Sequence, residues 1–327
     1  MKINGIRSLD IKVKAVGFGV VNWNGTVAVM GPDGKELNNH LMPKLRGYTN
    51  RTGKVKEDTG YEYKKSAMDV DFSKTPMYIS QNCIRHHMFR EQADDLHYVN
   101  RENKKDKNSL SEKDPAKILL SLSGLIRGFV IPATQTKRKS PLLVEDFVEQ
   151  LGNGNYEQFG NSGEKDENSI YSKTTFGETE YLAHMSLSIE DLQFISLDKK
   201  NDRAALEIKD FSEAEFIAEQ LTALLAELDF SGERKPVATA GNYARIGSIY
   251  AEPECGILLN QDAIEILVEN TLELIENLSI RQAKGWMAVD SMDVDYNDSG
   301  RMMRIKTSPE SINDEADSAY AVYYEAV

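Results

Sequence analysis

Apolar residues recur with two different periods along this chain, and this mixture limits the folds that it can adopt. An alternating pattern from Ile11 to Val21, ending in an Asn/Gly turn, predicts a β-strand, as does a second alternating run over residues 181–190. Two later stretches repeat their apolar residues every three or four positions, which is typical of amphipathic helices. Because strands and helices do not alternate regularly, the sequence favours an α+β fold over a doubly wound parallel sheet.

The two predicted helices carry clear boundary and face signals. In the first helix, Ser212 and Glu215 have the spacing of a capping box ahead of an apolar stripe that ends at Leu228. The second helix lies within residues 262–278. Its face opposite the apolar stripe is acidic, and we interpret these glutamates as solvated surface: Glu265, Glu269, Glu273 and Glu276.

The segments between these elements predict loops and one hairpin. Residues 98–114 are polar and charged, and residues 151–168 are rich in Gly and Asn, so both are expected to be loops. The basic run "TKRKS" precedes a segment that resembles a helix. After the second helix we expect a strand over residues 292–296 with Asp293 and Asp295 solvated, a turn, and a return strand over residues 301–306.

Charge is distributed unevenly between the two halves of the chain. Residues 1–147 hold 25 Lys and Arg against 17 Asp and Glu, whereas residues 148–327 hold 14 against 35, giving the net charge of −13. Such asymmetry indicates a nucleic-acid surface on one side, although solvated charges can also cluster by chance. The chain contains no signal-peptide or membrane-spanning pattern and only two cysteines, so a cytoplasmic setting without a disulfide framework is expected.

The stretch "ISQNCIRHHMFRE", residues 79–91, combines residue types that can cleave RNA, bind zinc or hold a phosphate. As a helix with Ser80 near its N-cap, it places His87 with the apolar residues and His86 with Asn82 and Arg85. The polar set and the helix N-terminus suit a phosphate. Zinc would need further ligands, which show no ligand spacing here, and RNA cleavage would need a second catalytic group that the sequence does not reveal.

Basic residues interleaved with aromatic residues occur in three other stretches. Residues 44–65 carry seven Lys and Arg with three tyrosines, "QTKRKS" contributes Lys137 and Arg138, and "SIRQAKGW" contributes Arg281 and Lys284. Together they suit a groove that follows an RNA backbone, where cations contact phosphates and aromatic rings stack on bases. The sequence contains no dinucleotide fingerprint, P-loop or GxSxG motif.

Several of these stretches resemble one known family, the repeated backbone subunit of type I CRISPR surveillance complexes (Cascade) in the compact I-F variant. The resemblance covers nearly the whole chain. It is carried by "VVNWNG" (20–25), "LRGYTNRTGKVK" (45–56), "YISQNCIRHHMFREQ" (78–92), "SPLLVEDFVEQLGNGNYEQFG" (140–160), "KTTFGETEY" (173–181), "QFISLDKKNDRAA" (193–205) and "NLSIRQAKG" (277–285).

This resemblance implies a modified RNA-recognition-motif core, that is, a ferredoxin-like antiparallel sheet with helices, within a single domain over residues 1–327. Large insertions, expected near residues 35–75, 98–114 and 135–170, would complete a hand-shaped molecule. A protruding hairpin, the thumb, is expected within residues 170–190 rather than 44–65. The basic half would line the RNA groove, and the acidic half would face solvent or a neighbouring subunit.

The same resemblance implies a set of RNA-binding residues and partners. The subunits would polymerise along a CRISPR RNA and present it for pairing with target DNA, beside a repeat-end RNA-processing subunit, a 5'-handle capping subunit and a recruited helicase-nuclease, with no catalysis, metal or cofactor of their own. An RNA-cleaving endoribonuclease and a protein-only scaffold are the alternatives. The expected RNA-binding residues are Asn22, Asn24, Lys44, Arg46, Ser80, Gln81, Asn82, Arg85, His86, Lys137, Arg138, Thr175, Phe176, Arg281, Gln282 and Lys284.

Overall fold

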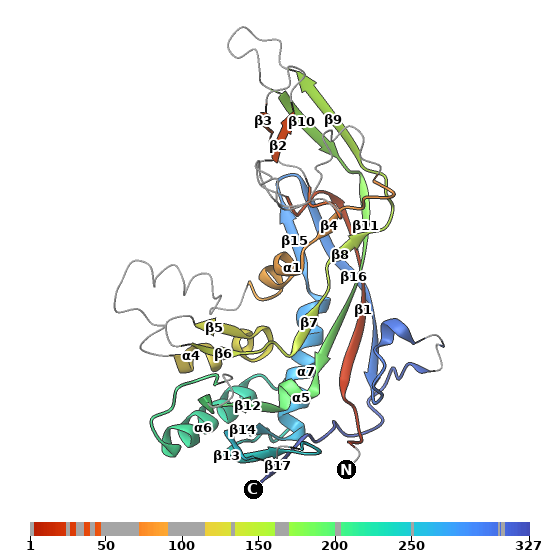
Figure 1. The fold of residues 1–327 in the computed structure, drawn as a ribbon. Helices are drawn as coiled ribbons and strands as arrows, with labels where there is room; N and C mark the ends of the chain where they lie inside the picture. The colour runs from red at the N-terminus through yellow and green to blue at the C-terminus, as the bar shows by residue number, and fades with distance from the viewer. Residues whose placement is uncertain are drawn as a thin grey trace.

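The structure is a computed structural model of the 327-residue chain, shown in Figure 1. It describes residues 3–23, 27–30, 36–39, 43–46, 72–90, 115–131, 135–160, 170–199, 204–249, 252–306, 308 and 311–327.

An antiparallel sheet of seven strands forms the centre of the fold, and β1 (Ser8–Gly19) lies in its middle. β1 pairs along its whole length with two strands, β11 on one side and β16 on the other. Leu9, Ile11 and Val13 point to one face and are fully buried, which is the alternation that a half-buried strand requires. The sheet order is β15 (Ser279–Gln282), β16 (Gly285–Asn297), β1, β11 (Glu178–Ser188), β8 (Phe147–Glu149) and β4 (Tyr78–Ile79), with β7 (Leu142–Val144) also on β11.

Helices cover the apolar face of this sheet. α1 (Gln81–Met88) packs against β7 and β15, and α7 (Gln261–Glu276) packs against β16. Their buried residues, such as Ile84 and Ile275, join the same continuous core as β1. None of the helices in the described part of the chain is long and apolar enough to cross a lipid bilayer.

A second antiparallel sheet lies at the lower end of the molecule in Figure 1. α5 (Ile189–Gln193) leads from β11 into it, and α6 (Phe211–Glu227) packs on β13 and β14. Its strand order is β12 (Phe194–Ser196), β14 (Glu254–Leu259), β13 (Ala238–Arg245) and β17 (Tyr324–Ala326). Beside it lie α4 (Pro115–Leu119), the π-helical turn η3 (Ser123–Arg127) and the hairpin of β5 (Phe129–Ile131) and β6 (Thr136–Arg138).

Two further hairpins project beyond the opposite end of the central sheet (Figure 1). One consists of β2 (Val27–Met30) and β3 (Glu36–Asn39), and the other of β9 (Asn155–Gly160) and β10 (Ile170–Thr175). The observed architecture is therefore α+β, as the periodicity predicts, and the strands predicted near residues 11–21 and 181–190 are confirmed as β1 and β11.

Two predictions in the middle of the chain are wrong, one of a loop and one of a helix. The Gly/Asn-rich segment predicted as a loop contains β9, because pairing with β10 satisfies its backbone groups. The segment after "TKRKS" forms the strands β7 and β8 rather than a helix, because the neighbouring edge of β11 offers it partners. The predicted loop over residues 98–114 lies outside the described residues.

The first predicted helix is confirmed as α6, but it begins earlier than the sequence indicates. Asp210, not Ser212, is the N-cap, and its carboxylate accepts a hydrogen bond from the Glu213 backbone N–H at 3.1 Å. Glu213 in turn accepts from the Lys209 N–H at 2.8 Å, so a reciprocal capping pair does form, two residues before the predicted one.

The expected return strand over residues 301–306 does not form. After β16 the chain instead forms the 3₁₀ turn η5 (Met303–Ile305) over one end of the sheet. There the Met303 N–H donates to the buried Asp10 carboxylate at 2.8 Å, and Lys306 forms a buried ion pair with Asp295 at 2.5 Å. Asp295, predicted to be solvated, is therefore fully buried, whereas Asp293 is exposed and pairs with Lys12.

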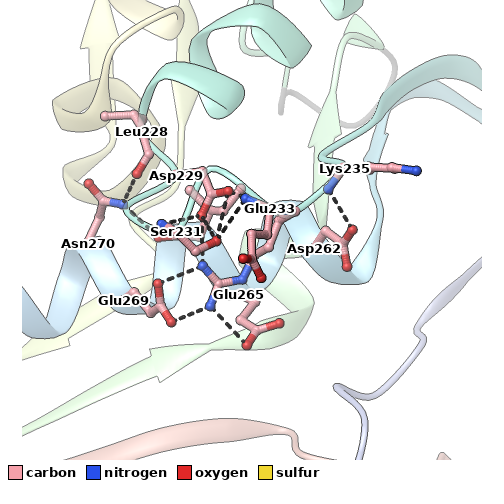
Figure 2. Close-up of polar contacts among 11 residues, drawn as sticks. Leu228, Asp229, Ser231, Glu233, Lys235, Asp262, Glu265, Glu269 and Asn270 are labelled. Carbon is pink, nitrogen blue, oxygen red and sulfur yellow. Dashed lines mark hydrogen bonds and ion pairs between the residues drawn. The ribbon is translucent and has the colours of Figure 1, made fainter.

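The acidic face of α7, predicted to be plain solvated surface, holds a structural arginine. Arg234 forms ion pairs with Asp229 at 2.8 Å, with Glu265 at 3.2 Å and with Glu269. Figure 2 shows the surrounding contacts, among them the Asn270 side chain donating to the Leu228 carbonyl at 3.0 Å. This cluster fastens the chain after α6 to α7.

The Asp229 carboxyl belongs to the same cluster and has a perturbed pKa. Burial raises the pKa, but hydrogen bonds from the Arg234 N–H, the Ser231 hydroxyl and the Arg234 guanidinium lower it to a net value of about 2. The side chain is only 2% exposed. The ionised form is therefore the one that the fold stabilises.

We expect Lys306→Met to lower the free energy of unfolding by about 3–5 kcal/mol, because it leaves the Asp295 carboxylate buried without its cation. Asp295→Asn/Lys306→Met, which keeps an oxygen to accept from the Asn313 N–H, should recover much of this loss. Lys12→Met is the matched control, since it removes an exposed partner of Asp293 and should cost less than about 1 kcal/mol. Urea unfolding measures all three, and equal losses for both single variants would contradict the assignment.

We expect Asp229→Asn to lower the melting temperature at pH 6, and the difference from the wild type to narrow below pH 4. A carboxyl with a depressed folded-state pKa stabilises the fold above its unfolded pKa of about 4, and this contribution is lost as the pH falls toward 2. Thermal unfolding by circular dichroism at stepped pH values tests this, with the exposed Glu219→Gln as control. A difference that persists at the lowest pH would exclude this role.

Candidate nucleic-acid interface

α1 begins where the sequence places it, with Ser80 as its N-cap. The first backbone N–H groups of this turn donate hydrogen bonds to side chains from elsewhere in the chain. The Ser80 N–H donates to Asn22 Oδ1 at 3.0 Å, and the Gln81 N–H donates to Asp146 Oδ1 at 2.9 Å. A carboxylate of the protein therefore already lies at the positive end of the helix, where the sequence predicted room for a phosphate.

Two cations flank this helix start. Residues 43–46 lie between residues 20–23 and 76–78, because the Lys44 N–H donates to the Asn22 carbonyl at 3.1 Å and the Tyr78 N–H donates to the Lys44 carbonyl at 2.9 Å. The Lys44 amino group donates to Ser80 Oγ at 3.4 Å. Arg46 is exposed, and its guanidinium lies 3.8 Å from Asp146.

The β15–β16 turn joins the same region from the other side. Gln282 donates from Nε2 to the Val21 carbonyl at 2.7 Å, and the Lys284 amino group lies 5.5 Å from the centroid of the Trp23 ring. The structure thus brings together seven of the predicted residues, which we call the α1 cluster: Asn22, Lys44, Arg46, Ser80, Gln81, Gln282 and Lys284.

Arg85 does not lie free on the helix as the phosphate-binding prediction assumed. Its guanidinium donates to Ser140 Oγ at 2.9 Å, to the Leu142 carbonyl and to the Arg127 carbonyl at 3.5 Å. Burial, and to a smaller extent Arg127, lower its pKa. These contacts give Arg85 a structural role, which is to connect α1 to the chain around β7.

The adjacent histidines of α1 are both half-buried, so the predicted division between a core face and a polar face is not sharp. Their rings contact edge to face with centroids 5.2 Å apart. Burial, and to a smaller extent His86 and Arg90, lower the pKa of His87, which favours the neutral form of this side chain. Within the described ranges, no three His, Cys, Asp or Glu side chains gather as the ligands of a metal ion.

The basic run in β6 is not a set of free cations. Arg138 is buried and donates to the carbonyls of Leu125, Asp191 and Phe194 at 3.1–3.3 Å, and burial lowers its pKa to about 10. Lys137 is half-buried beside it. A run of basic residues cannot show that its middle member points inward, so the structural contacts of Arg138 were not foreseen, and its contact with RNA stays a prediction.

The remaining predicted residues lie apart from the α1 cluster or are only partly described. Phe176 is buried against Phe72, with ring centroids 4.9 Å apart, and is a core residue rather than an exposed one. Thr175 ends β10, and Asn24 lies outside the described residues. Exposed positions include Asn82 on α1 and Arg281 on β15. Sequence reasoning missed Asp146 and Trp23, although both lie in stretches that carry the resemblance, "SPLLVEDFVEQLGNGNYEQFG" and "VVNWNG".

We expect Arg85→Met to lower the free energy of unfolding by about 1–3 kcal/mol, because it leaves buried carbonyls without donors. Asn82→Ala, at an exposed position on the same helix, is the control and should stay within about 0.5 kcal/mol of the wild type. Chemical denaturation measures both variants. Equal stability of the two would show that Arg85 is available for a ligand.

Comparison with known protein families identifies a match. The family described as "Type I-Fv CRISPR-associated protein Cas7fv-like" matches residues 5–327, nearly the whole chain. No curated protein matches the chain.

Proposed function

The chain belongs to the Cas7fv-like family of type I-Fv CRISPR-associated proteins, and we propose that it is the subunit that binds CRISPR RNA and repeats along it in a type I-F variant Cascade complex. In this role the protein contacts the RNA backbone, and the exposed bases pair with target DNA. It has no catalytic activity of its own, and cleavage falls to a recruited helicase-nuclease. Its other partners are further copies of itself and the subunits at the two ends of the RNA.

The α1 cluster is the observation that supports this proposal most. Four separate chain segments place cations and neutral polar groups around one helix start, with Lys44, Arg46 and Lys284 as the charged members. An RNA backbone presents a phosphate every few ångströms, and such a mixture of amino, guanidinium and amide donors suits it. The Asp146 carboxylate positions Gln81 and Arg46. The other two cations of the cluster, Lys44 and Lys284, would contact the phosphates.

The order of elements supports an RNA-recognition-motif core. β1, α1, β8, β11, α7 and β16 follow one another along the chain as βαββαβ, and the four strands are adjacent in the order β16–β1–β11–β8. This is the ferredoxin-like arrangement, to which the other elements are added. We place the thumb in the projecting β9–β10 hairpin, because residues 178–188 belong to the central sheet.

We expect Lys44→Ala/Lys284→Ala to weaken binding of single-stranded CRISPR RNA roughly tenfold at 150 mM salt, equivalent to about 1.4 kcal/mol. Loss of two phosphate contacts should also reduce the slope of log affinity against log salt by about 1.4. Lys199→Ala/Lys235→Ala changes the net charge equally at exposed positions outside the α1 cluster, and should leave both values unchanged.

Fluorescence anisotropy of labelled RNA over a salt series provides these measurements. Electron microscopy of protein expressed with arrays of different length tests assembly, for which we expect particles whose length follows the array. Protein that purifies without RNA and does not bind it would overturn the proposal in favour of a scaffold. Cleavage of the RNA that is lost on His86→Ala would overturn it in favour of an endoribonuclease.

A further inference from the structure

Two large aromatic rings lie exposed beside each other on the central sheet. Phe18 of β1 and Trp286 of β16 are directly paired in the antiparallel register, and they are 52% and 47% exposed. Residues paired in this way project from the same face with Cβ atoms about 5 Å apart. Their face is opposite to the one that carries Leu9, Ile11 and Val13 into the core.

Part of the described chain covers the other end of this face, whereas no described segment covers the aromatic end. Near Asp10 and Asp295 the chain after β16 closes over the sheet through η5. Phe18 and Trp286 lie at the far end of the same two strands. Burying rings of this size gives a large stabilisation, so a pair left in solvent indicates a surface that contacts something else.

Glycines allow the backbones that carry the two rings to lie close together. Gly17 and Gly19 flank Phe18, and a Cβ on either would collide with a backbone carbonyl, that of Trp286 or that of Lys284. Gly19 also has a φ of +75°, and a Cβ on Gly285 would come within 2.7 Å of the Phe18 carbonyl. The strand end and the turn therefore approach each other more closely than other residues would allow, which fixes the spacing of the backbone beneath the two rings.

Basic residues lie on one side of the two rings and acidic residues lie on the other. Arg281 is paired with Trp286 across β15 and β16, and Lys284 lies in the turn that joins these strands. On the other side, Glu178 is paired with Phe18, and Glu180 is neutralised by Lys14 at 3.3 Å. The phosphates of a nucleic acid are therefore attracted to the β15 edge and repelled by Glu178 on β11. With the phosphates at the β15 edge, the bases would extend over the two rings.

We propose that Phe18 and Trp286 form a platform on which unpaired bases of single-stranded nucleic acid stack, while Arg281 and Lys284 contact the adjoining phosphates. Stacking suits this site because every base has a flat apolar face, and the two rings are adjacent, exposed and bordered by cations on one side. The inference rests on the proposed RNA-binding function. It shares Lys284 with the α1 cluster and adds Phe18 and Trp286 as a stacking surface. RNA and displaced single-stranded DNA share this chemistry.

Fluorescence can test the platform directly, because Trp23 and Trp286 are the two tryptophans of the chain. In a Trp23→Phe background, emission reports on Trp286 alone. We expect a short single-stranded RNA to quench this emission, and an abasic oligonucleotide of equal length to bind without quenching. Parallel titrations with DNA show which nucleic acid the platform prefers.

Matched variants separate stacking from general binding. Phe18→Ala in the same background should weaken binding of the RNA by roughly five- to a hundredfold but hardly change binding of the abasic oligonucleotide. Phe216→Ala removes another exposed phenylalanine, 59% exposed on α6, and should have no effect on either.

The anisotropy of labelled oligonucleotides in the same samples distinguishes failure of the platform proposal from failure of the proposed function. RNA that binds while Trp286 emission stays unchanged overturns the platform and leaves the proposed function standing. RNA that binds neither the wild-type protein nor the Trp23→Phe variant overturns the proposed function itself. Loss of self-association in Phe18→Ala, with RNA binding unchanged, also overturns the platform and assigns the two rings to a contact between copies of the chain.

Discussion

The rest of the structure depends on the pairing of β1 along both of its edges. Its core face is fully buried at Leu9, Ile11 and Val13, and helices cover that face. Its end delivers residues 20–23 to the start of α1, so the same strand that organises the core also positions Asn22 and Trp23. A one-residue slip in either pairing would exchange the two faces of β1 and dismantle both the core and the candidate interface.

Buried polar groups divide the second face of this sheet into a closed part and an open part. Asp10 accepts hydrogen bonds from Ser186, Asn297 and the Met303 N–H, and the Asp295–Lys306 pair lies next to it. These groups are costly to bury singly, so they hold the covering segment in one position. The open part keeps Phe18 and Trp286 exposed. One face of the sheet thus has a structural end and an end suited to binding.

The sequence predicts the elements whose signals are local and leaves open those that depend on distant partners. The alternation in β1 and the 3.6-residue period of α6 and α7 identify these elements correctly. The start of α1 is also correct. The sequence predicts Arg85 and Arg138 as ligands of RNA, but each finds a partner far along the chain, 55 and 53 residues away. Asp295, predicted to be solvated, pairs with Lys306, 11 residues later, because the chain after β16 folds back over the sheet. Long or charged side chains are directed by tertiary contacts that no local pattern contains, and the missing return strand after β16 has the same cause.

The pairing of β1 with β16 affects how the chain folds during synthesis. The partners Lys12 and Asp293 are 281 residues apart, so during synthesis β1 emerges long before the strand that completes its second edge. Until then one edge of a strongly apolar strand stays open, and an open edge pairs readily with other chains. Such non-local pairing also folds slowly. A chain that ends before β16 would keep this edge of β1 unpaired, so the topology favours aggregation of incomplete chains.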